Sequence, residues 1–522
     1  MGKLFNISLA LFACTGSFLF GYDAGVMTDV IASKNFLAFF STTKDSPIIG
    51  AINSTFNGGA VFGALQGGLT MDRFGRKITI LMGSLICLVG ALLQCSAQNL
   101  AMILVGRIFT GWAVGLLSMA VPVYNSECAA PKIRGFIVGL SQQMIGIGFI
   151  VSTWVGYGSG TAPASSSIQW RLPLAFQCIP CAILAAGIMF MPESPRHLME
   201  TDREEEALRV LRKLHFTGAN DDEVMQEFHE IKTTIAAEKA ITVPGWRIMF
   251  TVKQWRTRLL HGVAVQCFTQ FTGISESCER LLMNNYLYLV DVIGYYQTTM
   301  YDALGITGNR NLLVAGIYNC MGPLANLIFI VFMIDRIGRR KPLLWGTIGI
   351  TIALICEAVV NSQINTKNPQ RGLSIAGVFF LFCVTVIFSL SWGPISWVYM
   401  SEVMPMQIRA RGNAFATGIG NWLVSTFWAQ VSPTALKELT WKFYFLFVAW
   451  NIVVTFPVVF FLFKETKQVS LEDIDLLFGE RALGTLPDDL HKSITHGANT
   501  VEDVSVPVDT EKREKNEEGQ AV

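Results

Sequence analysis

Asp23 is the residue whose type and position point most directly to chemistry. It lies in Gly21-Tyr22-Asp23-Ala24-Gly25, inside an apolar segment long enough to cross a membrane. An ionisable side chain in that setting is costly, and such residues usually serve a function. Loss of water favours the protonated form of a carboxyl group, so Asp23 is a candidate for binding and releasing a proton. The alternative is a static buried ion pair.

A second feature is a charged loop that occurs twice between apolar segments. Residues 72–77 read DRFGRK, and residues 335–341 read DRIGRRK. Each copy is followed by a proline and a Tyr-x-x-Glu element, which ends at Glu127 in the first case and at Glu402 in the second. Two ordered motifs, each repeated once, indicate a duplicated membrane protein.

The repeated loops have the chemistry of a latch. Their Arg and Lys side chains can pair with Glu127 and Glu402 and with carbonyl groups at helix C-termini. Bonds of this kind can form in one of two conformations and break in the other, and they would then hold the first conformation. The alternative is that the basic loops only fix the topology of the chain in the membrane.

Composition places the chain in a lipid bilayer. Of its 522 residues, 51% are hydrophobic and only 15% are charged, which is too little polar material to cover a soluble protein of this length. A formal net charge of +1 gives no basic surface for nucleic acid. The six histidines show no metal-ligand spacing, and we expect neither a metal nor a cofactor. Most of the eleven cysteines lie in apolar runs, as packing residues do.

Twelve segments have the length and composition of a membrane-spanning helix, which needs about 20 mostly apolar residues. They lie near 6–24, 48–70, 78–98, 101–122, 136–158, 172–191, 258–302, 312–333, 342–360, 374–399, 413–433 and 441–463. The first carries Asp23 and no small-residue cleavage pattern, so it does not read as a signal peptide.

Charge distribution predicts the orientation and the domains. The loops after spans 2, 4, 8 and 10 hold most of the loop Lys and Arg residues, so both termini should be cytoplasmic. We expect the chain to divide into a six-helix half at 1–191, a charged cytoplasmic linker with amphipathic helices at 192–257, a second half at 258–463 and a largely disordered tail at 464–522.

These motifs together resemble the sugar porter family of the major facilitator superfamily. The resemblance also includes residues 192–196 (PESPR) after span 6 and residues 464–467 (KETK) after span 12, and it covers roughly residues 8–475. At the last element the family usually has Pro-Glu-Thr-Lys-Gly, whereas this chain has Lys464 and Gln468 at the ends. The resemblance implies an all-α membrane protein with twelve transmembrane helices in two six-helix halves.

The resemblance also implies a cytoplasmic network that controls the change of conformation. Its expected members are Asp72, Arg73, Arg76, Glu127, Arg134, Glu193, Asp335, Arg336, Arg339, Glu402, Arg409 and Glu465.

A sugar presents hydroxyl groups and apolar C–H faces, so its pocket needs amides and aromatic rings near the middle of the membrane. The residues that resemble the family's sugar contacts are Gln142, Gln266, Gln270, Asn319, Trp397, Asn421 and Trp422. Where many sugar porters have adjacent glutamines, this chain has Thr269-Gln270. Taken singly, an amide in a membrane helix often serves only to hold two helices together.

For Asp23, the family resemblance implies proton coupling, with Arg107 as the partner. We therefore predict secondary transport of a sugar, a monosaccharide, with proton symport, by a monomer in the plasma membrane. The alternatives are a facilitator without proton coupling, a carrier of a polyol or sugar acid, and a sugar sensor that transports nothing. A membrane enzyme is not expected, because no nucleophile, base and orienting group occur together in the helices.

Residues 275–291 do not fit the seventh span. They place Glu276, Glu279, Arg280 and Asp291 at mid-membrane depth, where each charge is costly. Ser275-Glu276-Ser277 can be encoded with a splice-donor string, and Val290-Asp291 can end an intron. We therefore interpret 275–291 as a retained intron or an error in the gene model, with a real insertion as the alternative.

Overall fold

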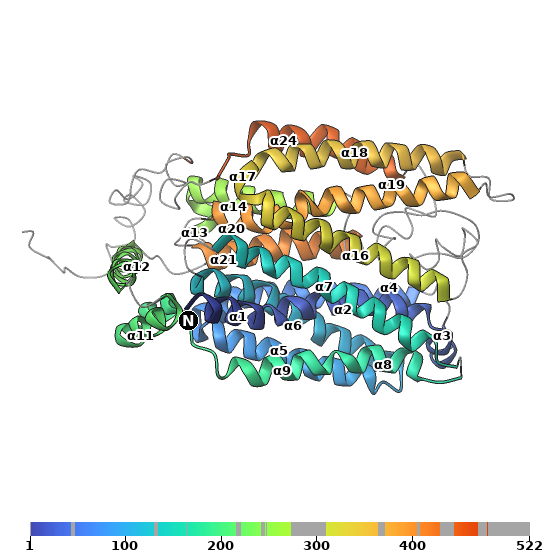
Figure 1. Ribbon diagram of the computed structural model, residues 1–522, viewed down its shortest axis with the longest axis horizontal. Helices are drawn as coiled ribbons and strands as arrows, with labels where there is room; N and C mark the ends of the chain where they lie inside the picture. The colour runs from blue at the N-terminus through green and yellow to red at the C-terminus, as the bar shows by residue number, and fades with distance from the viewer. Residues whose placement is uncertain are drawn as a thin grey trace, which may run out of the picture.

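The computed structural model describes residues 2–42, 47–129, 134–163, 165–215, 221–241, 246, 248–272, 309–363, 371–404, 408–428, 443–467 and 478. Within these ranges the regular secondary structure is entirely helical. The long helices run side by side in one bundle, and the N-terminal and C-terminal halves of the chain occupy opposite sides of it (Figure 1).

The N-terminal half contains the first nine helices. They are α1 (Gly2–Ala13), α2 (Thr15–Ala32), α3 (Lys34–Phe39), α4 (Pro47–Phe74), α5 (Arg76–Cys95), α6 (Leu100–Cys128), α7 (Arg134–Gly160), α8 (Ile168–Phe176) and α9 (Cys178–Ile188). The first span is divided at Cys14 into α1 and α2, and the sixth is divided at Gln177 into α8 and α9.

The C-terminal half repeats this pattern less regularly. Its helices are α14 (Lys253–Phe271), α16 (Asn309–Phe332), α17 (Ile334–Ile337), α18 (Arg340–Gln363), α19 (Arg371–Ser389), α20 (Trp392–Val403), α21 (Arg409–Phe415), α23 (Phe443–Trp450) and α24 (Phe456–Phe461). Two π-helical segments, Ala416–Leu423 after α21 and Asn451–Thr455 after α23, lie within the eleventh and twelfth spans.

Four helices lie between the two halves in sequence: α10 (Pro195–Glu200), α11 (Glu204–His215), α12 (Asp221–Ile241) and α13 (Ile248–Thr251). Helices α11 and α12 lie outside the bundle, at the end where the N-terminus is found (Figure 1). His215 fixes α11 there, because its Nε2 donates to the carbonyl of Cys128 at 3.2 Å and its Nδ1 lies 2.8 Å from Glu227 on α12.

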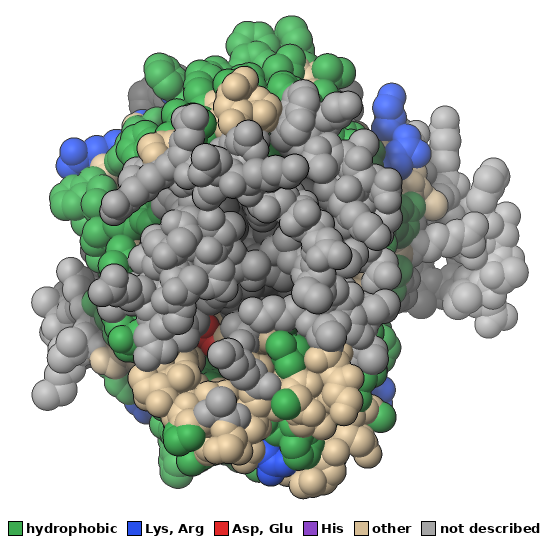
Figure 2. Space-filling view, turned by 90° about the vertical axis from the view of Figure 1, so that its right-hand side faces the viewer, with side chains coloured by type: hydrophobic (Ala, Val, Ile, Leu, Met, Phe, Trp, Pro, Cys, Tyr) green, Lys and Arg blue, Asp and Glu red, His purple; other side chains and the backbone are tan. Residues whose placement is uncertain are grey.

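Seven stretches among the described helices are long and apolar enough to cross a membrane. They are Phe5–Ile31, Arg76–Cys95, Leu100–Cys128, Ile168–Ile188, Arg340–Val360, Phe382–Val403 and Tyr444–Phe461. Helices α4 and α7 lie parallel to these spans (Figure 1), but they carry more polar and glycine residues because they face the other half of the protein. Large hydrophobic side chains such as Phe62, Trp345 and Phe461 are exposed on the outside of the bundle, as expected of a surface that meets lipid. Figure 2 shows hydrophobic side chains around the rim of the end remote from α11 and α12.

Each half has its own hydrophobic core, and the two cores meet. The core of the N-terminal half includes Ala414 and Trp422, which belong to the C-terminal half. Trp397 packs against both cores. Within the N-terminal half, α4 and α6 are in backbone contact, since a Cβ atom at Gly111 would lie only 1.9 Å from the carbonyl oxygen of Phe56. This close approach fixes α4 beside the helix that carries Arg107.

Candidate functional site

Asp23 lies on α2 beside Arg107 of α6, the partner that the family resemblance implied. Both side chains are fully buried. The Arg107 Nη1 atom lies 3.6 Å from Asp23 Oδ1 and donates to the Asp23 carbonyl oxygen at 3.1 Å. A guanidinium at this distance stabilises the ionised carboxylate, and its withdrawal would leave the carboxylate to take up a proton.

Two further side chains contact the Asp23 carboxylate, and the sequence reasoning missed both. Gln177 Nε2, at the division between α8 and α9, donates to Oδ1 at 2.9 Å. The thiol of Cys87 on α5 lies 3.7 Å from Oδ2. The available signal was Gln177 itself, a buried amide within an apolar span.

The same helix carries a second buried acid, Asp29, which the sequence reasoning also missed. It is 7% exposed, and in the described part of the chain neither of its carboxylate oxygens has a hydrogen-bond partner. It lies against Gly156 of α7, where a Cβ atom would come within 2.0 Å of Oδ2.

Three of the candidate sugar residues, Gln270, Asn421 and Trp422, meet beside the N-terminal half. Gln270 on α14 donates from Nε2 to Asn421 Oδ1, in the π-helical segment of the eleventh span. The next residue, Trp422, packs against Phe20 of α2 with ring centroids 5.1 Å apart and against Phe56 of α4 at 6.1 Å. These residues of the C-terminal half therefore line the contact between the two halves.

Several of these side chains carry polar atoms that have no partner in the described part of the chain. They are Gln142 Oε1 on α7, Gln270 Oε1 and Trp422 Nε1, all shielded from solvent. Buried polar atoms are nearly always hydrogen-bonded in native proteins. Two acceptors and one donor near the contact between the halves are therefore suited to the hydroxyl groups of a bound ligand.

The remaining candidates lie on helices of the same interface. Gln266 Nε2 lies 3.3 Å from the sulfur of Met400 on α20, and Trp397 is on the same helix. Asn319 on α16 donates to Thr153 Oγ1 on α7 at 2.7 Å, so in this conformation its amide links the two halves.

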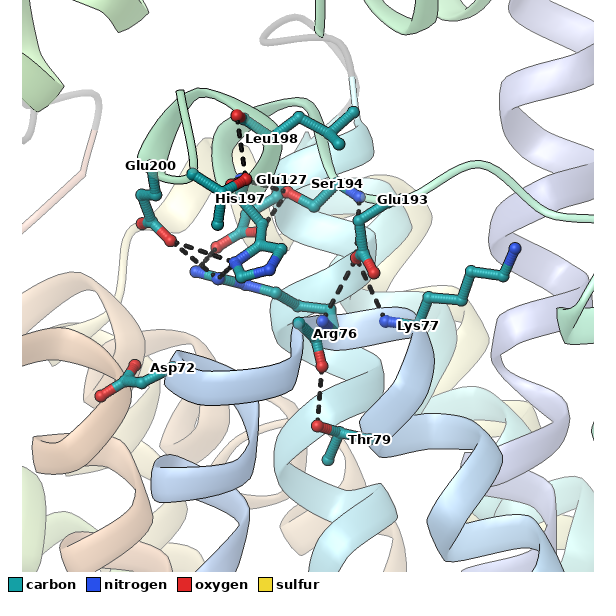
Figure 3. A network of polar contacts seen from close by, with 12 residues as sticks. Asp72, Arg76, Lys77, Thr79, Glu127, Glu193, Ser194, His197, Leu198 and Glu200 are labelled. Carbon is teal, nitrogen blue, oxygen red and sulfur yellow. Dashed lines mark hydrogen bonds and ion pairs between the residues drawn. The ribbon is translucent and has the colours of Figure 1, made fainter. Parts of the chain in front are cut away.

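The first charged loop forms a network with α6 and α10 (Figure 3). Arg76 donates to Glu127 at 2.8 Å and to Glu200 at 2.9 Å, and its Nη1 lies 2.9 Å from His197 Nδ1. Glu193 Oε1 accepts the backbone N–H groups of Arg76 and Lys77 at 3.2 and 3.1 Å, which caps the start of α5.

Glu200 and His197 were not predicted members of this network. Burial raises the pKa of Glu200, but the hydrogen bonds and positive charge supplied by His197 and Arg76 outweigh burial and lower the pKa to about 2. Glu200 is therefore ionised at neutral pH and holds α10 against Arg76.

The second loop has the same geometry. Arg339 donates to Glu402 at 2.9 Å, and Glu465 accepts the backbone N–H groups of Arg339 and Arg340 at 2.7 and 3.1 Å. Thr466 donates to Glu402 as Ser194 donates to Glu127. The sequence duplication is thus a duplication of contacts.

One ion pair of the described chain joins the two halves: Arg411 Nε on α21 lies 3.0 Å from Asp72 Oδ2 at the end of α4. Arg411 was not among the predicted network members. Arg409, which was, donates to the carbonyl of Met404 in its own loop at 3.4 Å.

The other predicted members of the network are less engaged or are not described. Arg73 lies over the ring of Phe74, and the side chain of Arg336 is exposed. The side chains of Arg134 and Asp335, and residues 275–291, lie outside the described residues.

Comparisons with known proteins show the family and the fold of the chain. The profile of the family described as "Sugar (and other) transporter" matches residues 9–478. The chain is 37% identical over 482 residues to the MFS-type transporter criB of Aspergillus cristatus, which covers 92% of this chain and 95% of the relative. It is 31% identical to a high-affinity glucose transporter of Kluyveromyces lactis (91% and 85% covered) and 30% identical to a probable quinate permease of Aspergillus niger (91% and 89%).

Among solved structures, the chain is similar to the proton:xylose symporter XylE bound to 6-bromo-6-deoxy-D-glucose. The TM-score is 0.76 at 23% identity, with 92% of this chain and 100% of that chain covered. For the inward-open conformation of XylE from E. coli the TM-score is 0.68 at 23% identity, with 90% and 99% covered. The likeness confirms the predicted fold, the twelve-span major facilitator fold in two halves.

Proposed function

Because the chain belongs to the sugar transporter family and is a transporter, not an enzyme, we propose that it moves a monosaccharide together with a proton. The sugar binds between the halves, in contact with Gln142, Gln270 and Trp422. Asp23 takes the proton, and Arg107 returns to Asp23 when the proton leaves. Both termini are cytoplasmic, and the protein works as a monomer in the plasma membrane.

The observation that carries the sugar site is a set of buried polar atoms, at Gln142, Gln270 and Trp422, that have no partner among the described residues. Such atoms destabilise the empty protein, and ligand hydroxyl groups would satisfy them. The rings of Phe20 and Phe56, which pack against Trp422, offer an apolar surface for the C–H faces of a sugar ring.

A sugar acid is the second candidate substrate, favoured by the similarity to a probable quinate permease. A carboxylate substrate would need a positive charge at the site. Arg107 and Trp422 both contact Phe56, but Arg107 is engaged with Asp23. The neutral sugar is therefore the better fit.

Uptake of radiolabelled D-glucose, D-xylose and quinate by transporter-deficient cells tests the proposal. We expect uptake of one of the two sugars, and replacement of Gln142 or Gln270 by Ala should weaken its apparent affinity by about 1–3 kcal/mol, because a hydroxyl group loses its partner. Gln98→Ala, which removes an exposed amide, is the matched control. Unchanged affinity in both pocket variants would show that the pocket lies elsewhere, and uptake of quinate alone would favour the sugar acid.

A further inference from the structure

Helix α4 forms one side of the environment of Arg107. The guanidinium Nε donates to the carbonyl oxygen of Ile52 at 3.4 Å, and Nη2 donates to Asn53 Oδ1 at 3.5 Å. One turn further along, the ring of Phe56 lies under the guanidinium, 4.2 Å from its central carbon. A cation this close to a ring face, away from water, is held by a cation–π interaction. These three residues of α4 therefore help to fix the cation that pairs with Asp23.

The same ring faces the other half of the protein. Trp422 contacts Phe56 edge to face, with centroids 6.1 Å apart and ring planes at 82°. Phe56 and Trp422 are each 2% exposed, and Arg107 is fully buried. Phe56 thus lies between the proposed sugar site and the proposed proton site, and it touches a residue of each.

The backbone around Phe56 is fixed within the N-terminal half, whereas Trp422, which contacts the Phe56 ring, belongs to the C-terminal half. The contact of the Phe56 carbonyl with Gly111 holds α4 to α6. Trp422 belongs to a π-helical segment, a feature that often occurs at functional sites, and its Nε1 has no partner among the described residues. A sugar hydroxyl that accepts from Nε1 would set the position of the indole, and the indole edge would in turn set the ring of Phe56.

We propose that Phe56 is a positioning residue that links sugar binding to proton binding. The proposal rests on the proposed function. With Trp422 in place, Phe56 holds Arg107 beside Asp23, which stays ionised. When a bound sugar shifts Trp422 relative to α4, the guanidinium moves from the carboxylate, and one proton binds to a carboxylate oxygen to give the neutral acid. The same proton leaves when Arg107 returns. The titratable groups around this pair are the thiol of Cys87 on α5, which contacts Asp23, and the thiol of Cys181 on α9, which interacts with Cys87. On α2 itself, Tyr22 interacts with both Asp23 and Asp29.

Phe56→Leu tests the proposal, because leucine keeps an apolar side chain and removes the ring face. Phe56→Tyr keeps the ring face against Arg107, so it should retain more of the pH dependence than Phe56→Leu does. Phe62→Leu makes the same change on α4 at a side chain that is 58% exposed, and it is the matched control. The substrate is the better transported of radiolabelled D-glucose and D-xylose in proteoliposomes. Sugar exchange without a gradient reports whether each variant is folded.

We expect Phe56→Leu to exchange sugar but to lose coupling. The change in apparent sugar affinity between acidic and neutral external pH should shrink by about 5-fold or more, and accumulation driven by a proton gradient should fall. If the wild type is proton-coupled and Phe56→Leu keeps the same pH dependence, the proposed role of Phe56 is wrong, whereas the proposed function stands. If Phe56→Leu does not exchange sugar, Phe56→Met takes its place under the same criteria. Accumulation by wild type that ignores the proton gradient would overturn the proposed function and this inference with it.

Discussion

At the scale of single residues, the charged groups inside the membrane are the most informative. Asp23 has a cation and two hydrogen-bond donors around it, whereas Asp29 has none among the described residues. An ionised carboxylate needs such partners in a medium of low dielectric constant. The surroundings of Asp23 therefore favour an ionised carboxylate in this conformation, and movement of Arg107 away from it would favour protonation.

The first prediction concerns Asp23→Asn, which keeps the size of the side chain but cannot lose or gain the charge. We expect it to abolish uphill sugar accumulation while sugar exchange continues, because the energy of the proton gradient no longer reaches the sugar site. Uptake with and without a protonophore measures this. The control is Glu205→Gln on the exposed face of α11. Undiminished accumulation by Asp23→Asn would contradict proton coupling at this residue.

The sequence identified Asp23 from its own type and position, but Arg107 only through the family resemblance. Gln177 and Cys87 were missed because their contacts depend on how α2, α5 and α9 pack together, and no periodicity in one segment records that packing. Asp29 was missed because the predicted first span ended near residue 24, whereas α2 continues to Ala32. The functional roles of all these residues remain predictions.

At the scale of elements, the duplicated loops use the same backbone device. Gly75 and Gly338 have φ angles of +89° and +93°, which other residues rarely adopt. A Cβ atom at Gly75 would lie 2.8 Å from Glu193 Oε2 and from His197, and one at Gly338 would lie 2.8 Å from Glu465. The glycine thus lets each loop approach the carboxylate that caps the following helix.

The second prediction concerns Gly75→Ala, which should destabilise the protein by about 1–3 kcal/mol, because φ +89° with ψ 171° is a backbone conformation used almost only by glycine, with a further cost from the contact with Glu193. Gly58→Ala on α4 is the control, because a Cβ atom there meets nothing within 4 Å and alanine should stabilise the helix by about 0.5–1 kcal/mol. Thermal unfolding in detergent distinguishes them. Equal unfolding temperatures for Gly75→Ala and the wild type would show that the loop does not depend on this backbone conformation.

Hydropathy and the repeats predicted the long helices, but not their interruptions. Some spans are divided, at Cys14, Gln177 and Ser391, and others contain π-helical segments. These interruptions do not change the apolar composition of the span, so its mean hydropathy does not reveal them. Gln177 and Trp422 lie at two of these irregular places, and both are candidate site residues. Local departures from regular helix geometry often coincide with functional sites, which limits prediction from periodicity at the positions of greatest interest.

At the scale of the whole molecule, the two halves are in contact at the end that carries the basic loops. Gly68 lies close to Ala414 there, and Asp72 pairs with Arg411. Each half also contains its own Arg–Glu pair, Arg76–Glu127 and Arg339–Glu402. A pair across the halves depends on the conformation, whereas the internal pairs are part of each half. The duplicated motifs predicted the internal pairs because the repeat records contacts within one half. Arg411 precedes a glycine as Arg134 does in the first copy, but the repeat does not show which side chains meet across the halves, so its pair with Asp72 was not predicted.

The last prediction concerns residues 275–291, which lie outside the described residues, between α14 and α16. Joining Ile274 through one residue to Val292 gives a seventh span of ordinary length, and the codon formed at that junction can encode Asn, the residue that the sugar porter family has there. We therefore expect the mature message to lack the codons for Ser275 to Asp291, and the shorter protein to transport sugar better than the longer one. Sequencing the spliced transcript and comparing uptake by the two forms in the same cells decides the question. A mature message that retains these codons, with full transport by its product, would mean that the segment is a genuine insertion that the membrane domain accommodates.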